Sequence, residues 1–196
     1  MKLIIASNNK HKIIEIKDIL GDTFEEVLSQ GEAGCNLDVE ENGTTFAENS
    51  YIKAKAIADE FSGYAVLADD SGLAVDYLDG APGVYSARYC GVHGNDKANN
   101  DKLLKELEGV KDRSARFICA VTLILPDGRV VTAEGKTEGE VTLAPIGEGG
   151  FGYDCIFMSE ELGKTFGVAS EEEKNSVSHR GKALRTLAML LKIQKV

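Results

Sequence analysis

The sequence of 196 residues carries a formal net charge of −10, because 22 Lys and Arg stand against 32 Asp and Glu. Hydrophobic residues make up 43% of the chain and charged residues 28%, with three prolines and no biased tract, which excludes a disordered chain and a solenoid. Such an acidic protein is a poor binder of DNA or RNA, and it would repel a polyphosphate unless its site gathered a divalent metal and local cations. The length predicts a single domain over residues 1–196.

The cysteines and the N-terminus predict a cytoplasmic protein. Neither a CxxC pair nor metal-ligand spacing connects the four cysteines, which we therefore expect to be free thiols in a reducing compartment: Cys35, Cys90, Cys119 and Cys155. The start, MKLIIASNNKHK, contains only four consecutive strongly apolar residues, too few for a signal peptide, and no later run approaches membrane-spanning length. We expect neither a nucleic acid nor a membrane as a partner.

The first elements along the chain are a predicted strand and a predicted helix. Residues 2–6 form a short apolar run typical of a buried strand. Residues 10–20 have helical periodicity, and Gly21 supplies a stop. The apolar face of this helix consists of Ile13, Ile16 and Leu20.

A second helix is predicted to begin at Thr45, because Thr45 and Glu48 have the spacing of a capping box. We expect it to end at Gly63. Its predicted buried stripe consists of Ala54, Ile57, Ala58 and Phe61. Residues 65–68 are then predicted to form a buried strand.

The second half of the chain predicts a helix, a hairpin and a terminal helix. Residues 95–109 should bury Leu103, Leu104 and Leu107, and residues 178–196 should bury Leu184, Leu187, Ala188 and Leu191. Residues 116–125 and 129–143 should pair about the turn PDGR. The second of these strands alternates between polar outward positions and apolar inward ones: Thr132, Glu134, Lys136, Glu138 and Glu140 against Val131, Ala133, Val141 and Leu143. The element order predicts an α/β fold with a mixed sheet flanked by helices.

The motif SNNKHK lies where the first strand turns into the first helix. Backbone N–H groups, a positive helix end and two lysines at such a position predict an anion site, formed by Ser7, Asn8, Asn9, Lys10, His11 and Lys12. Ordinary N-capping by Asn8 or Asn9 with solvated lysines is the competing interpretation.

Two pairs of adjacent acids are further candidates. Glu40 and Glu41 precede a glycine-containing turn into the second helix, which displays Lys53 and Lys55, although acids in a loop are usually solvated. We expect Glu48 to cap its own helix.

The second pair, Asp69 and Asp70, follows the predicted strand at residues 65–68, and only one of the two can face a given ligand, because successive side chains point to opposite sides. Mg²⁺ needs only one or two carboxylates beside phosphate oxygens and water. The alternative is a solvated turn in which Asp70 caps Ser71 and Gly72.

Two late motifs complete the candidate site. GGFGYD offers aromatic rings and an acid suited to stacking a flat base and accepting its N–H, from Phe151, Gly152, Tyr153 and Asp154. Its competing interpretation is a glycine loop with both rings in the core. The segment EEEKNSVSHRGKA places Lys174, His179 and Arg180 around the start of the last helix, where a solvated charged segment is the alternative. Taken together, the motifs fit a nucleotide with phosphates and magnesium.

The set SNNKHK, EENGTTFAENSYIKA, LADDSGLAVDYLDGAPGVYSARYCG, GGFGYD and SHRGKAL resembles the inosine and xanthosine triphosphate pyrophosphatase family of house-cleaning nucleotidases. The match runs from Lys2 to Leu191. One departure is Asn8, where many members carry Gly. Because Asn replaces Gly at positive φ better than other residues do, we expect a slight change in loop geometry and no lost function.

The resemblance implies magnesium-dependent hydrolysis of aberrant purine nucleoside triphosphates (ITP, dITP and XTP) to the monophosphate and pyrophosphate. It also implies an elongated mixed sheet with two lobes and an active-site cleft between them, and a homodimer. By motif match, Asp70 would be the general base and a Mg²⁺ ligand, and Glu41 would assist at the metal. Residues 7–12 and Lys53 would hold the triphosphate, and Ser71 would line the site.

Base choice follows from donors and acceptors. Arg180 carries only donors, so it is expected to pair with the O6 acceptor of hypoxanthine or xanthine and not with the amino group of adenine. The 2-amino group of guanine is expected to be rejected near Lys174. Two alternatives stay open, namely a pyrophosphatase for other modified nucleotides and a purine-nucleotide-binding protein without catalysis.

Overall fold

The computed structural model of the chain describes residues 1–193, so the last three residues of the predicted terminal helix lie outside the described residues. The chain divides into two compact units. Unit 1 comprises residues 1–70, 119–135 and the chain from Arg180 onward, and unit 2 comprises residues 71–118 and 136–179. No helix within residues 1–193 has the length and apolar character needed to cross a membrane.

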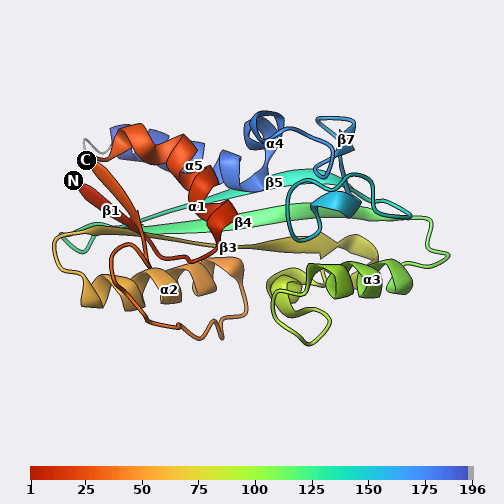
Figure 1. The fold of residues 1–196 in the computed structure, drawn as a ribbon, viewed down its shortest axis with the longest axis horizontal. Helices are drawn as coiled ribbons and strands as arrows, with labels where there is room; N and C mark the ends of the chain where they lie inside the picture. The colour runs from red at the N-terminus through yellow and green to blue at the C-terminus, as the bar shows by residue number, and fades with distance from the viewer. Residues whose placement is uncertain (194–196) are drawn as a thin grey trace. The chain divides into compact units, whose positions relative to one another are not determined.

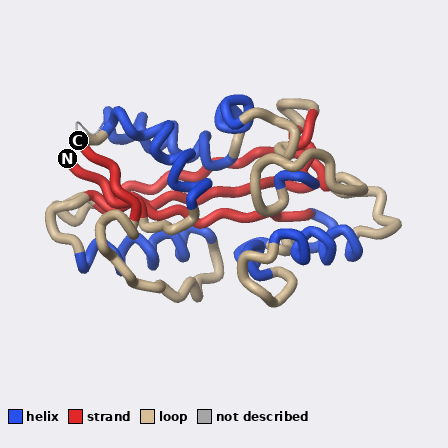
Figure 2. Tube along the Cα trace, viewed as in Figure 1, coloured by secondary structure: helices blue, strands red, loops and turns tan. Residues whose placement is uncertain are grey.

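The strands form a seven-stranded mixed sheet in the order β2-β1-β3-β4-β5-β6-β7. Their bounds are β1 Lys2–Ile5, β2 Glu26–Ser29, β3 Ala65–Val75, β4 Ser114–Ile124, β5 Val130–Val141, β6 Phe157–Ser159 and β7 Lys164–Thr165. β1 pairs in parallel with β2 and β3, whereas β6 pairs antiparallel with β5 and β7. The predicted mixed sheet flanked by helices is confirmed (Figure 2).

The helices of unit 1 are α1 Lys10–Leu20, α2 Phe46–Glu60 and α5 His179–Ile193, of which α5 starts at the last residue of unit 2. In Figure 1, α1 and α5 cover one face of the unit 1 strands and α2 covers the other. Alternate strand residues divide between these faces, since Leu3 and Ile5 join the core of α1 and α5, and Ile4 joins that of α2. The same alternation fixes which way the acids of β3 point.

The predicted helices form where expected, although α2 ends at Glu60 and not at Gly63, and a short helix over Glu171–Val177 was not predicted. α1 has the predicted bounds, although Gly21 keeps helical φ and continues into a short 3₁₀ turn. α2 begins after the N-cap Thr45, whose side chain and that of Glu48 form the predicted capping box. Of the predicted apolar positions, several are only partly buried: Ile13, Ala58, Phe61, Leu104 and Ala188.

Unit 2 contains α3 Asp96–Glu106 and α4 Glu171–Val177. Its core includes Leu73, Leu103 and Leu107, and the rings of Phe117, Phe157 and Phe166. Along β5, the predicted alternation of polar exposed and apolar buried residues holds as far as Val141. The inward position predicted for Leu143 is wrong, because β5 ends at Val141 and Leu143 is 83% exposed.

The strand predicted over residues 65–68 is too short. β3 continues through both acids to Val75, with ten of its eleven residues buried, and the turn expected at Ser71 and Gly72 does not form. Asp69 and Asp70 therefore lie inside a strand and not at its end.

Candidate active site

The candidate site of unit 1 lies where β1 ends. β1 stands between β2 and β3 in the sheet. Helix α1, which follows β1, and helix α2, which precedes β3, lie on opposite faces of this part of the sheet (Figure 1). The pairing of β1 with β3 ends at Ile5 and Leu67, and the amide of Ala6 then donates to Leu67 O at 2.8 Å. Beyond this point β3 continues to Val75 with β4 as its other neighbour in the sheet. In open sheets with parallel strands, ligands bind at such a switch point, beyond the carboxyl ends of the strands.

The loop between β1 and α1 is organised by Asn9. Its side-chain oxygen accepts hydrogen bonds from the amides of His11 at 3.0 Å and Lys12 at 3.3 Å, so Asn9 is the N-cap of α1, as the capping interpretation predicted. Ser7 Oγ accepts from the amide of Asn9 at 3.2 Å. This fixes the loop and leaves the side chains of Asn8, Asn9, Lys10 and His11 exposed beside it.

The backbone of Asn8 differs from the expectation. Among the non-glycine residues that the structure describes, only Asp79 has a positive φ, so Asn8 does not replace a left-handed glycine here. The expectation that Asn8 takes the place of a glycine at positive φ is therefore wrong for this chain.

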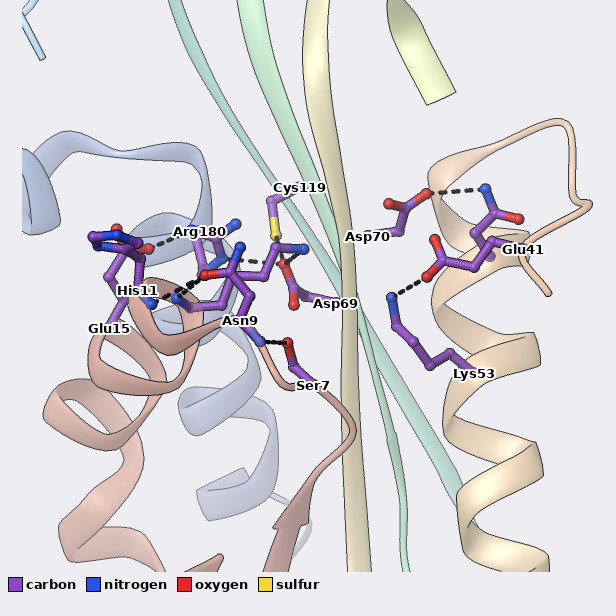
Figure 3. Close-up of polar contacts among 12 residues, drawn as sticks. Ser7, Asn9, His11, Glu15, Glu41, Lys53, Asp69, Asp70, Cys119 and Arg180 are labelled. Carbon is purple, nitrogen blue, oxygen red and sulfur yellow. Dashed lines mark hydrogen bonds and ion pairs between the residues drawn. The ribbon is translucent and has the colours of Figure 1, made fainter. Parts of the chain in front are cut away.

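Asp69 projects to the α1 and α5 face of the sheet. Its Oδ2 accepts from Lys12 Nζ at 3.0 Å and from Arg180 Nε at 3.1 Å (Figure 3). Burial alone would raise the pKa of Asp69. The charges of Lys12 and Arg180 outweigh burial and hold that pKa well below its ordinary range, so Asp69 is a carboxylate at neutral pH. The residue is therefore an anchor for two cations.

Arg180 connects α5 to two acids. Nη1 donates to Glu15 of α1 and Nε donates to Asp69, and the side chain of Arg180 is 1% exposed (Figure 3). Although burial opposes its charge, these acids raise the pKa of Arg180, and the guanidinium stays charged. The expected reading of a purine O6 by Arg180 is not supported, because this side chain is enclosed and its Nε and Nη1 donate to carboxylates.

Asp70 projects to the opposite face, toward α2. Its Oδ2 accepts from Asn49 Nδ2 at 3.0 Å (Figure 3). Burial, followed by the negative charge of Glu41, raises the pKa of Asp70, against the lowering effects of Lys12 and Lys53. A carboxylate in such surroundings is a better proton acceptor than an exposed one. The adjacent acids thus have opposite electrostatic environments.

Glu41 and Lys53 form an ion pair of 2.6 Å beside Asp70 (Figure 3). Burial would lower the pKa of Lys53, but the charges of Asp69 and Glu41 raise it, so the lysine remains a cation. The neighbouring candidates point elsewhere, since Glu40 is exposed and Lys55 pairs with Asp59 on the surface of α2.

Two carboxylates in this arrangement suit a hydrated cation. Within residues 1–193 no group of three or more His, Cys, Asp or Glu side chains is arranged to hold a metal ion. Mg²⁺, however, is commonly bound by one or two carboxylates together with phosphate oxygens and water. Burial, and after it the charge of Glu41, raises the pKa of Asp70, and a divalent cation near both carboxylates would offset the repulsion between them.

Two of the candidates in unit 2 are buried among core side chains. Tyr153 is buried and its hydroxyl donates to Ser86 O at 2.8 Å, as the core interpretation of this ring predicted. His179 is also buried, and its ring stacks on Phe117 with 4.7 Å between centroids. Ser71 is half-buried within β3.

Three other candidates of unit 2 come together. Lys174 Nζ donates to Asp154 Oδ2 at 2.8 Å and lies 4.6 Å from the centroid of the Phe151 ring. The amide of Phe151 donates to the same Asp154 oxygen at 2.9 Å. Phe151 and Gly152 stay half-buried, so an aromatic face, a cation and a carboxylate are combined at one loop.

The chain matches the Ham1 family over residues 3–190. It belongs to the Ham1 family. The predicted family is thereby confirmed. The dITP/XTP pyrophosphatase of Clostridium perfringens is 52% identical over 198 residues, with 97% of each chain covered, and that of Desulforamulus reducens is 51% identical over 193 residues, with 97% of this chain and 96% of the relative covered. The structure of the Staphylococcus aureus Ham1 protein superposes with a TM-score of 0.88 at 41% identity, over 99% of this chain and all of that one.

Two side chains of this candidate site were missed by the sequence analysis. Glu15 holds Arg180, and Asn49 holds Asp70. Both had a signal in helical spacing, since Glu15 lies three residues after Lys12 and Asn49 lies four residues before Lys53. Each therefore shares a helix face with a predicted site residue.

Proposed function

We propose that this chain is a nucleoside triphosphate pyrophosphatase that hydrolyses dITP, XTP and ITP to the nucleoside monophosphate and pyrophosphate. Relatives of about half identity over nearly the whole chain are named dITP/XTP pyrophosphatase. The single observation that carries the proposal is the buried Asp70, with a raised pKa, beside Glu41 and Lys53, in the part of β3 just beyond its parallel pairing with β1.

In the proposed reaction a water oxygen attacks the α-phosphorus while the bond to the bridging oxygen breaks and pyrophosphate leaves. Asp70 accepts the proton of the attacking water, and Asn49 fixes the carboxylate that does so. Lys12 and Lys53 supply positive charge near the phosphates, and each is held in place by an acid. Neutralising charge on the bridging and leaving oxygens is usually the largest contribution to phosphoryl chemistry.

Mg²⁺ is the proposed cofactor, with Asp70 and Glu41 as the residues that would hold it. When bound, a divalent cation neutralises charge on phosphate oxygens and on the leaving pyrophosphate. The loop of residues 7–12 is proposed to bind the triphosphate through its helix N-terminus and exposed side chains.

In unit 2, the loop of residues 149–155 is proposed to recognise the purine base. The half-buried ring of Phe151 suits stacking on a base, and the buried ion pair of Lys174 with Asp154 supports this ring from behind. This assignment replaces the base contact first expected of Arg180.

Three further expectations belong to this proposal. They are a single pyrophosphatase domain over residues 1–196, a homodimer and a cytoplasmic location, the last supported by four free cysteines. Light scattering after size-exclusion chromatography tests the dimer.

Pyrophosphate release tests the function. The purified chain should release pyrophosphate from dITP, XTP and ITP with Mg²⁺, far more slowly from dATP and dGTP, and not at all with excess EDTA. Tight nucleotide binding without pyrophosphate release would favour the non-catalytic alternative. Faster turnover of modified pyrimidine triphosphates would favour the other pyrophosphatase class.

A further inference from the structure

Helix α3 holds one residue of the loop of residues 149–155 through both of its backbone polar groups. The amide of Gly152 donates to Asp96 Oδ2 at 2.8 Å, and Gly152 O accepts from Asn100 Nδ2 at 3.1 Å. Asn100 Nδ2 also lies 3.3 Å from Cys155 Sγ. Asp96 and Asn100 are four residues apart, so they share one face of α3, and both bind the backbone of Gly152 from this face.

The loop needs such support because its backbone is unusual. Gly150 and Gly152 both have positive φ, at 74° and 62°, a conformation in which neither helix nor strand can form. A Cβ at Gly150 would lie 2.2 Å from Asp154 Oδ2, so the loop also packs tightly on its own acid. Its shape therefore depends on contacts from neighbouring elements.

Phe151 lies between the two sets of contacts. On one side Asp96 and Asn100 of α3 hold the next residue, Gly152. On the other side Asp154 accepts from the Phe151 amide and from Lys174 of α4. The backbone that carries the Phe151 ring is thus held on both sides, and Lys174 Nζ lies 4.6 Å from the centroid of this ring.

We propose that Asp96 and Asn100 are positioning residues that hold the Phe151 ring ready for a purine base. The inference rests on the proposed function, in which this loop recognises the base. A ring that is already fixed loses less conformational freedom when a ligand stacks on it, so the affinity for the base is higher. Substitution of Asp96 or Asn100 should therefore weaken substrate binding and leave the chemistry at Asp70 unchanged.

Three variants of α3 and a matched control test the proposal. Asp96→Ala removes the acceptor of the Gly152 amide, Asp96→Asn keeps an acceptor but removes the charge, and Asn100→Ala removes the donor. Asp101→Ala is the control, because Asp101 lies on the same helix and pairs only with Lys97 among the contacts described. Asp96→Asn also separates the hydrogen bond from the favourable effect of an acid in the first turn of α3.

The first readout is amide hydrogen exchange of residues 149–155 without substrate. Exchange should be at least about 10-fold faster in Asp96→Ala and Asn100→Ala, and close to wild type in Asp96→Asn and Asp101→Ala. Unchanged exchange in Asp96→Ala would overturn the proposal that α3 holds the loop.

The second readout is steady-state kinetics with dITP. We expect KM to rise about 3- to 10-fold in Asp96→Ala and Asn100→Ala with kcat within about twofold, and competitive inhibition by inorganic tripolyphosphate to be unchanged. Equal losses in kcat, or a parallel weakening of tripolyphosphate inhibition, would indicate general damage and overturn the positioning role. A wild-type protein that releases no pyrophosphate from dITP would instead overturn the proposed function. The exchange readout would still decide whether Asp96 and Asn100 hold the loop of residues 149–155.

Discussion

Asp69 and Asp70 are adjacent in β3 but serve opposite faces of the sheet. Asp69 contacts Lys12 and Arg180 on the side of α1 and α5, and Asp70 contacts Asn49 of α2. The cations lower the pKa of the first acid, whereas burial and Glu41 raise the pKa of the second. One carboxylate is therefore an anchor for cations and the other is suited to accept a proton, and the two should respond differently to the same substitution.

Asp70→Asn should abolish turnover without harming the fold. The loss in kcat should be at least about 10²-fold, as is typical when a general base is removed. A raised pKa means that the folded state disfavours the charged form, so the free energy of unfolding at pH 7 should stay the same or rise. Pyrophosphate release and urea unfolding measure the two effects, and near-normal kcat would exclude Asp70 as the base.

Asp69→Asn should have the opposite profile and destabilise the protein. Removing one member of a buried ion pair costs about 3–5 kcal/mol. Since the pKa of Asp69 is depressed in the folded state, its contribution is complete above the unfolded value near 3.8 and is lost only as pH falls through the lower folded pKa. Urea unfolding should therefore show a constant destabilisation between pH 5 and pH 8, and a loss that vanishes within that interval would contradict this account.

Glu41→Gln should weaken the response to metal. The substitution keeps the shape of the side chain but removes one of the two carboxylates that would hold the cation, so half-maximal activity should need at least about 10-fold more Mg²⁺. Glu40→Gln is the control, because Glu40 is exposed and lies one residue earlier. Identical Mg²⁺ dependence in both variants would argue against Glu41 as a ligand.

Arg180→Lys should lower activity equally on all bases. Lysine cannot reproduce the planar fork that reaches Asp69 and Glu15 together, so the variant should be less stable and should lose a similar factor in kcat/KM on dITP and dATP. Arg185→Lys, on the exposed side of α5, is the matched control. A loss confined to dITP would restore Arg180 as a base-reading residue.

Local signals were sufficient to predict α1, α2, α3 and α5 and the exposed and buried faces of β5, but not the short helix α4. The capping box at Thr45 determines where α2 begins, and the alternation of polar and apolar residues along β5 separates solvent-exposed from buried positions. They failed at β3, where the letters DDSG resemble a turn. There, Asp69 is compensated by cations from helices and Asp70 by an amide, so tertiary contacts override the local preference.

The sequence predicted most side chains of the candidate site, but it did not predict the contacts that Arg180 makes. Arg180 was assigned to the base because its side chain carries only donors, which suit the O6 acceptor of hypoxanthine or xanthine. Its partners Asp69 and Glu15 are 111 and 165 residues away in the sequence, so no local pattern could show that this charge is buried and already matched. Helical spacing, in contrast, could have identified Asn49 from Lys53.

The core of unit 1 also contains a buried thiol, that of Cys119, whose chemical labelling can report on local opening. Cys119 is buried with its Sγ 4.0 Å from Asp69 Oδ2, and burial raises its pKa to about 12. A thiol in this environment cannot be alkylated in the closed protein, because the reagent needs both access and a thiolate. The rate at which an iodoacetamide label appears on the peptide containing Cys119 would therefore measure how often the charged cluster around Asp69 opens to water.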